Sequence, residues 1–185
     1  MTTVTPLPEL TGSYVIDPIH SRIGFVARHA MVTKVRGSFN DFEGTVELDG
    51  ENPGKSAVNL TIKAASIDTR NAGRDGHLRS GEFLDLENHP TITFVSTGAE
   101  RPDDRTVQLT GDLTIRGVTR SITIDFDFEG SAKDTYGNQR LGFEGSVDIN
   151  RKDYGITWNA ALETGGVLIS DKIVLEFEVS LVKQG

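Results

Sequence analysis

Apolar and polar residues alternate almost without error in four segments of this chain, and no other feature constrains the fold as strongly. Such period-two alternation is typical of a strand with one buried and one solvated face, because successive side chains of a strand point to opposite sides. The apolar positions of the four segments are Val58-Leu60-Ile62, Val107-Leu109-Gly111-Leu113-Ile115, Ile122-Ile124-Phe126-Phe128 and Ile173-Leu175-Phe177-Val179-Leu181.

Three glycines stand where this alternation requires a large apolar side chain, namely Gly44, Gly111 and Gly145. An inward glycine removes volume from a core. The strands therefore either bend sharply at these glycines or leave room for a molecule that is not protein.

The alternation and the turn signals between the segments predict an all-β fold. About eight antiparallel strands that follow one another along the chain favour a barrel or a sandwich. We expect strands over residues 13–17, 22–27, 35–48, 56–64, 91–98, 106–115, 120–130, 139–150 and 172–182.

Two irregular segments interrupt the strand pattern. The first covers residues 67–90 and contains a predicted short helical insert around residues 74–80, and the second covers residues 151–159. Irregular inserts between regular strands are candidates for a lid or a barrel mouth. We expect residues 1–11 to form a flexible lead-in and residues 12–185 to form one barrel domain.

Composition excludes several classes of function. The chain has 185 residues, a formal net charge of −8 and a sequence pI near 5.0, so no basic surface is predicted that would attract nucleic acid. The same balance disfavours adsorption to anionic head groups, but it permits a neutral lipid tail inside the fold. Because cysteine is absent, disulfides, thiolate metal sites and a cysteine nucleophile are excluded.

The first ten residues have neither the basic region nor the apolar region of a secretory signal. No apolar run is long enough for a transmembrane helix. We therefore expect a cytoplasmic protein without stable membrane insertion.

The four histidines, His20, His29, His77 and His89, are the obvious candidates for metal binding or acid–base chemistry. They lie in different segments, and none belongs to an HxH or HExxH motif. A zinc or iron site would require them to converge through tertiary folding alone. We therefore predict no metal site, and each histidine is interpreted as capping a turn or pairing with a carboxylate.

The densest cluster of hydrogen-bonding side chains lies at residues 74–79 and contains Arg74, Asp75, His77 and Arg79. Guanidinium and imidazole donors suit the oxygen-rich head of a ligand at a pocket mouth. The same groups also suit a structural network that holds an irregular segment against the strands, and this interpretation is slightly favoured. The segment with Arg151, Asp153, Tyr154 and Trp158 allows the same two interpretations, with the structural one favoured.

Nucleophilic catalysis has weak support in the sequence. Ser21 follows His20, and Ser80 lies close to His77, but neither serine belongs to a G-x-S-x-G motif. Adjacency in sequence does not aim a hydroxyl at an imidazole. We predict that the protein is not an enzyme.

The phenylalanines carry more information than the titratable residues. Nearly all of them fall on apolar registers, and they are Phe25, Phe39, Phe42, Phe94, Phe126, Phe128, Phe143 and Phe177. Core packing would explain their positions. A filled small barrel, however, favours interdigitating branched aliphatic residues, whereas phenylalanine beside glycine makes a smooth wall next to a gap. The pattern therefore favours a cavity.

Five motifs in the same order resemble the YceI-like family over nearly the whole chain. They begin at Asp17, Gly37, Arg74, Gly111 and Asn150, and read DPIHSRIGF, GSFNDFEG, RDGHLRS, GDLTIRGVT and NRKDYGITW. The resemblance implies an extended antiparallel lipocalin-like β-barrel whose hydrophobic pore holds a polyisoprenoid or a similar long-chain lipid. Family members are often exported with a signal sequence, which this chain does not show. The resemblance carries over no catalytic activity, metal or cofactor other than the bound lipid.

The resemblance and the aromatic pattern together suggest a set of ligand-binding residues. The expected contacts with the lipid chain are Phe25, Phe42, Phe94, Phe126, Phe128 and Phe143. The expected contacts at the polar end and mouth are His20, Arg74, His77, Arg79 and Trp158. In this interpretation Gly44, Gly111 and Gly145 point into one continuous channel that opens near residues 74–79.

Burial makes this function energetically reasonable. Each five-carbon isoprene unit contributes on the order of 3 kcal/mol at about 0.8 kcal/mol per methylene. A few units exceed association costs of about 4–15 kcal/mol.

Two alternatives stay open at this point, and so does the oligomeric state. One alternative is a small-molecule enzyme with a His, Arg and Asp site at the barrel mouth. The other is a stress-response structural module whose barrel is filled by its own side chains. The expected partners are a hydrophobic small-molecule ligand and, in a homodimer, a second copy of the chain.

Overall fold

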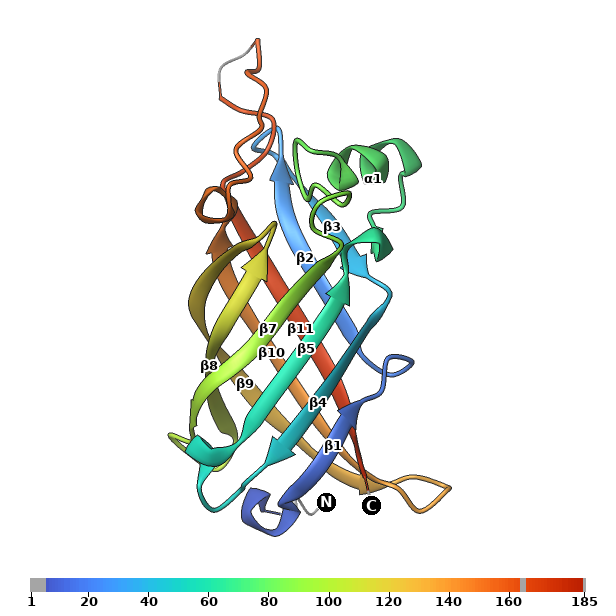
Figure 1. Ribbon diagram of the computed structural model, residues 1–185, viewed down its shortest axis with the longest axis vertical. Coiled ribbons are helices and arrows are strands. Elements are labelled where there is room, and N and C mark those ends of the chain that lie inside the picture. Colours follow the sequence, from blue (N-terminus) through green and yellow to red (C-terminus); the bar gives the residue numbers. More distant parts are fainter. Residues whose placement is uncertain (1–5, 164–165, 185) are drawn as a thin grey trace.

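The chain forms a closed antiparallel β-barrel with one short α-helix at one end (Figure 1). The computed structural model describes residues 6–163 and 166–184. The strands are β1 Gly12–Ile16, β2 Arg22–His29, β3 Thr33–Phe39, β4 Phe42–Leu48, β5 Ala57–Lys63, β6 Ile67–Asp68, β7 Thr91–Glu100, β8 Thr106–Ile115, β9 Val118–Lys133, β10 Gln139–Asn150 and β11 Lys172–Lys183. The helices are η1 Leu7–Leu10, η2 Pro53–Lys55, η3 Ala64–Ser66, α1 Ala72–Arg79 and η4 Arg151–Tyr154.

Eight strand positions close the barrel, because three of them are each filled by two short strands in succession. The sheet order is β1-β4-β5-β7-β8-β9-β10-β11-β2-β3-β6, and a further pairing of β1 with β11 closes the ring. Both β1 and β2 pair with β11, at successive parts of its length. All pairings between these strands are antiparallel, so the chain runs up and down around the barrel as the sequence predicts.

The interrupted strands correct two boundaries of the sequence prediction. The strand expected over 35–48 is divided into β3 and β4 at Asn40 and Asp41. The Asn40 amide donates to the Ser66 carbonyl, and the Asp41 carbonyl accepts from the Lys63 amide, so both residues leave the regular ladder. The separate strands expected over 13–17 and 22–27 occupy one barrel position. In contrast, β9 continues three residues beyond the predicted end of its strand.

The predicted flexible lead-in is wrong for residues 6–11. Residues Leu7–Leu10 form the 3-10 helix η1, in which Leu7 and Leu10 are 1% and 5% exposed. The Tyr14 hydroxyl donates to the Leu10 carbonyl at 2.7 Å. Two buried leucines thus attach η1 to the end of the barrel where β1 begins and β11 ends (Figure 1). Residues 1–5 lie outside the described part of the chain.

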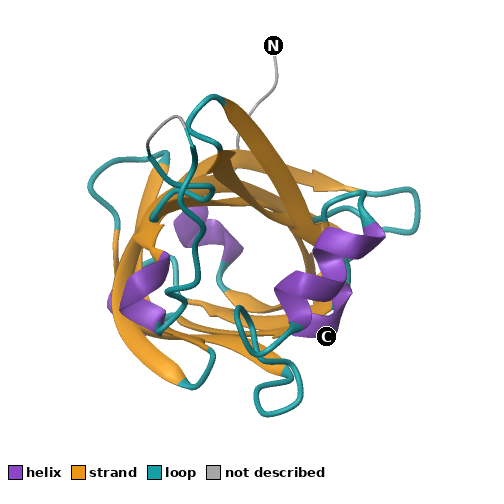
Figure 2. Cartoon of the chain, turned by 90° about the horizontal axis from the view of Figure 1, so that it is seen from above, coloured by secondary structure: helices purple, strands orange, loops and turns teal. Residues whose placement is uncertain are grey.

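The helical insert forms as predicted, over Ala72–Arg79 instead of 74–80. The Asn71 side chain caps its N-terminus by accepting from the Arg74 amide at 2.9 Å. Viewed from above, the strands form a ring, and α1 lies at its rim and not within it (Figure 2). Among the described residues, no helix has the length and apolar character needed to cross a membrane.

The three inward glycines do not open onto empty space. A Cβ atom at Gly44 would lie 2.4 Å from Ile16 Cδ1, and one at Gly111 would lie 2.4 Å from Phe94 Cζ. At Gly145 it would lie 2.8 Å from both the Asp125 carbonyl oxygen and Phe126 Cδ1. Each glycine therefore makes room for a large side chain of a neighbouring strand, and none of the three lines the cavity described below.

Candidate functional site

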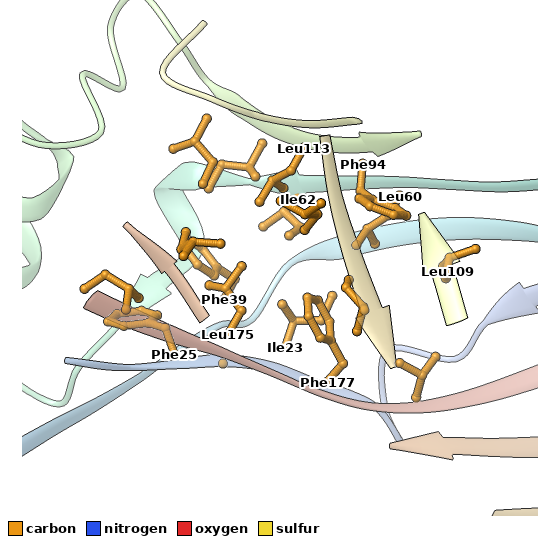
Figure 3. Close-up of a pocket in the computed structure, with 18 of the residues that line it drawn as sticks. Ile23, Phe25, Phe39, Leu60, Ile62, Phe94, Leu109, Leu113, Leu175 and Phe177 are labelled. Carbon is orange, nitrogen blue, oxygen red and sulfur yellow. The ribbon is translucent and has the colours of Figure 1, made fainter. Parts of the chain in front are cut away.

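An apolar cavity of about 590 Å³ lies inside the barrel. Residues from every barrel strand line it, most of them Leu, Ile, Val and Phe. Figure 3 shows lining side chains from several of these strands, among them Phe25, Phe94 and Phe177. Residues Leu60, Ile62, Leu109 and Leu113, for example, alternate along their strands with polar residues that point outward. Period-two alternation therefore lines the cavity as well as building the sheet. The volume lies within the range of about 300–1,000 Å³ that is typical of ligand pockets.

Three rings form a cluster on the α1 side of the cavity. The centroid of the His77 ring lies 4.9 Å from that of Phe83 and 4.7 Å from that of Trp158, both nearly edge to face. The Phe83 and Trp158 centroids lie 5.4 Å apart. All three residues line the cavity. His77 Nε2 also lies 3.1 Å from Glu82 Oε2, so the imidazole has a polar partner as well as two aromatic ones.

The other polar residues of α1 have structural contacts. Arg74 donates from Nε to Thr69 Oγ1 and from Nη2 to the Thr69 carbonyl, both at 2.7 Å. Buried Asp75 accepts from the Thr69 amide at 2.9 Å. Arg79 donates to the carbonyls of Ala65 and Ile67. Most of this cluster therefore holds the irregular segment against the barrel, and the Arg74 side chain lines the cavity in addition.

Arg151 organises the opposite side of the same end. Its guanidinium is 4% exposed and donates to the carbonyls of Ile156, Trp158 and Ser170 at 2.9 Å each. Burial lowers the pKa of Arg151, and the charge of Asp171 opposes this effect. The buried cation thus fixes the segment that carries Trp158. The carboxylate beside Arg151 is that of Asp171, at 3.7 Å, and not that of Asp153 in its own segment.

The structure brings seven of the suggested binding residues to the cavity wall. These residues are Phe25, Arg74, His77, Phe94, Phe126, Phe143 and Trp158.

The other four suggested residues lie off the cavity wall. His20 is 66% exposed and pairs with Asp17 at 2.7 Å. Phe128 is buried against Phe143, with ring centroids 5.2 Å apart. Phe42 is buried without lining the cavity, and Arg79 binds the backbone as described.

Sequence reasoning missed lining residues at both ends of the cavity. At the η1 end these are Leu7 and Arg101, and at the α1 end they are Arg28, His29 and Ile169. The strand register predicts the aliphatic residues of the wall. In contrast, no local signal indicates that Leu7, in a Pro-rich lead-in, reaches the interior.

The polar groups do not assemble into a metal site. Within residues 6–163 and 166–184, no three side chains of His, Asp or Glu converge so that they could hold an ion. Three of the four histidines instead pair with single carboxylates, as His20–Asp17, His77–Glu82 and His89–Asp85.

A closed antiparallel barrel with an apolar interior defines a lipocalin-like protein, a class in which the barrel encloses the ligand. The YceI-like domain model matches residues 14–181, and the chain therefore belongs to the YceI-like family. This confirms the family resemblance seen in the sequence.

Relatives and solved structures agree with this assignment. A UPF0312 protein of Staphylococcus aureus is 38% identical over 165 residues, which is 89% of this chain and 94% of that protein. A solved YceI protein of Campylobacter jejuni has a TM-score of 0.74 at 30% identity and covers 85% of this chain and 90% of its own. A Saccharophagus degradans structure, described as a polyisoprenoid binding domain, has a TM-score of 0.71 at 16% identity, covering 92% of this chain and 98% of its own.

Proposed function

We propose that this protein binds a polyisoprenoid or a similar long-chain lipid inside the barrel, and that it stores or carries this lipid without chemical conversion. The observation that carries the proposal is the cavity of about 590 Å³ with its nearly continuous apolar wall. A long hydrocarbon chain is the class of ligand that gains most from such a wall, because burial contributes about 0.8 kcal/mol per methylene.

The polar groups at the cavity support a binding role with permissive head-group recognition. The guanidinium groups of Arg74 and Arg151 donate to backbone or hydroxyl oxygens of the protein itself. These groups are therefore largely occupied by structural contacts. Selectivity would then come from the length and shape of the apolar chain, with few contacts to its head.

The fold supports the same class of ligand. The Saccharophagus degradans domain described as polyisoprenoid binding shares the barrel with this chain. At 16% identity this likeness concerns the fold, so the choice of ligand rests on the cavity of this chain.

Filling the cavity with a side chain tests the proposal. Ala27 lines the cavity, whereas Ala57 is exposed on the outside of the barrel. We expect Ala27→Phe to weaken the binding of a fluorescent prenyl or acyl probe about tenfold, because the ring displaces roughly two methylenes of the ligand. The matched control Ala57→Phe should bind the probe like the wild type. Failure of the folded wild type to bind either probe would overturn the proposal.

A further inference from the structure

Exposed apolar side chains gather beside one end of the cavity. Among the described residues, six large apolar side chains are exposed, and three of them are Met31, Val32 and Val167. Met31 and Val32 are 57% and 74% exposed at the turn between β2 and β3. Gly166 lies next to this turn, since a Cβ atom on it would be 3.6 Å from Met31 Cγ. Val167 is the residue that follows Gly166 in the chain. The three side chains therefore belong to one region of the surface.

This region adjoins the rim of the cavity. His29, the last residue of β2, lines the cavity and forms a β-bridge with Ile169, which lines it too. The Ala30 amide donates to the carbonyl of Leu168, a third lining residue, at 2.7 Å. The exposed turn thus follows the cavity wall directly along the chain.

The backbone of the turn would favour glycine, but the sequence places alanine and methionine there. Ala30 and Met31 have φ angles of 52° and 67°. Two successive residues with positive φ characterise type I′ hairpin turns, in which Asn-Gly is the preferred pair. Methionine at this position has a conformational cost that the fold does not explain. A role for the exposed side chain would explain it.

The hairpin that carries this turn is also basic. Residues 18–40 contain Arg22, Arg28, Lys34 and Arg36 but no Asp or Glu, in a chain whose net charge is −8. Arg22 pairs with Glu176, whereas no ion pair is found for Arg28, Lys34 or Arg36 among the described residues. Arg28 lies directly opposite Lys34 in the β2–β3 pairing. Like charges in this arrangement repel each other, and an anionic partner would relieve the repulsion.

We propose that residues 28–36 form a docking surface for an anionic lipid membrane. The apolar side chains of Met31 and Val32 would enter the interface, and Arg28, Lys34 and Arg36 would lie against anionic head groups. The net charge of −8 does not prevent this, because salt screens charges beyond about 8 Å. Docking would place the cavity rim against the source of its lipid. The proposal goes beyond lipid binding and makes the membrane a partner of this protein.

Flotation with lipid vesicles tests the docking surface without using the cavity. We expect the protein to float with vesicles of phosphatidylcholine mixed with phosphatidylglycerol, and less with pure phosphatidylcholine or at high salt. Lys34→Gln with Arg36→Gln should weaken binding about 25-fold, at about fivefold per cation. Met31→Asp with Val32→Asp should weaken it by about tenfold or more. Both double variants alter exposed residues, so thermal unfolding should resemble that of the wild type.

Ile19→Asp is the matched control, since Ile19 is 86% exposed in the β1–β2 loop, outside this hairpin. Its vesicle binding should equal that of the wild type. The proposal is overturned if the wild type does not float with anionic vesicles or if the hairpin variants float as well as Ile19→Asp. It is also overturned if the Met31 and Val32 changes alter the sedimentation mass but not vesicle binding, which would indicate pairing of two chains. Because flotation measures association with the vesicle and not occupancy of the cavity, failure of docking can be distinguished from failure of the proposed lipid binding.

Discussion

At the scale of single residues, the inward glycines act through their neighbours. Gly111 and Gly145 are overlain by the rings of Phe94 and Phe126, and Gly44 by the side chain of Ile16. A ring that lies flat over glycine keeps the wall smooth while it covers a backbone that would otherwise be bare. Gly111 and Gly145 shape the cavity wall by letting aromatic rings lie against the sheet, Gly44 does the same for Ile16, and the cavity itself is lined by other residues.

Gly111→Ala tests this role. The new Cβ would lie 2.4 Å from Phe94 Cζ and 2.7 Å from the Val95 carbonyl oxygen, so the ring and the strand must shift. We expect a loss of about 1–3 kcal/mol in the free energy of unfolding, measured in urea. Phe94→Leu in the same chain should restore part of the loss. Gly142→Ala is the control, since its nearest contact would be an ordinary 3.6 Å to Glu129 Cβ. Equal stability of the two alanine variants would contradict the account.

Arg151→Met tests the buried cation at the cavity rim. The substitution removes hydrogen bonds from a charged donor to the carbonyls of Ile156, Trp158 and Ser170. We expect a destabilisation of about 3–5 kcal/mol and faster hydrogen exchange in residues 156–163 and 166–171. Lys152→Met is the matched control, because Lys152 is exposed and contacts the same Asp171 at 3.3 Å. It should lower the free energy of unfolding by at most about 1 kcal/mol. Similar losses in both variants would count against a special role for Arg151.

At the scale of structural elements, Arg140 links three parts of the chain near the closure of the barrel. From β10 it donates to Asp17 in the β1–β2 loop and to Asp134 in the β9–β10 turn, both at 2.8 Å. Burial raises the pKa of Asp17, but hydrogen bonds from Arg140, His20 and the Ile19 amide outweigh this and hold the pKa at about 2. The hydrogen bond from Arg140 is the main cause that lowers the pKa of Asp134 to about 2 as well.

These shifts predict acid sensitivity with a definite sign. Because both carboxyl groups have a lower pKa when folded than the usual value of about 3.9, their contribution to stability is complete above about pH 4. It is lost as the pH falls towards 2. Arg140→Met should therefore reduce the slope of unfolding free energy against pH between about 2 and 4. Lys63→Met in the exposed Lys63–Asp41 pair controls for the loss of a cation. An unchanged slope in Arg140→Met would refute the link.

The helix η1 limits the depth of the cavity at the end opposite α1. Leu7 lines the cavity, whereas Leu10 is equally a buried leucine of η1 but does not line it. We expect Leu7→Ala to extend the longest saturated fatty acid that binds, since it lengthens the available space. Both Leu7→Ala and Leu10→Ala should cost about 2–5 kcal/mol of stability, but Leu10→Ala should leave the length limit unchanged. The same length limit in both variants would contradict a role for η1 in chain-length selection.

At the scale of the whole molecule, the strand alternation predicted most of the barrel, because the period-two pattern is local. Residues such as Leu109, Leu113 and Phe177 lie inside as their register requires. What could not be predicted depends on contacts between distant segments. The burial of η1, the pairing of both β1 and β2 with β11, and the carbonyls around Arg151 arise only when the barrel closes.

For the candidate site, too, local sequence predicts part of the wall and contacts between distant segments decide the rest. Phe25, Phe94, Phe126 and Phe143 reach the cavity wall because they fall on inward registers of strands. Phe42 and Phe128 fall on such registers too, yet packing with neighbouring elements buries them away from the cavity. Register alone indicates which face a residue occupies, and the position along the barrel axis then decides whether it meets a ligand.

Lipid binding inside the barrel is the central claim, and native mass spectrometry tests it most directly. The protein would be purified without detergent and measured before and after addition of a long-chain prenol, with organic extraction to identify any bound molecule. We predict a folded protein that carries one lipid or takes up one prenol, and the lipid-bound fraction should be smaller in Ala27→Phe at the same prenol concentration. A folded wild-type protein that stays empty in both measurements, or an equal lipid-bound fraction in Ala27→Phe, would contradict the account.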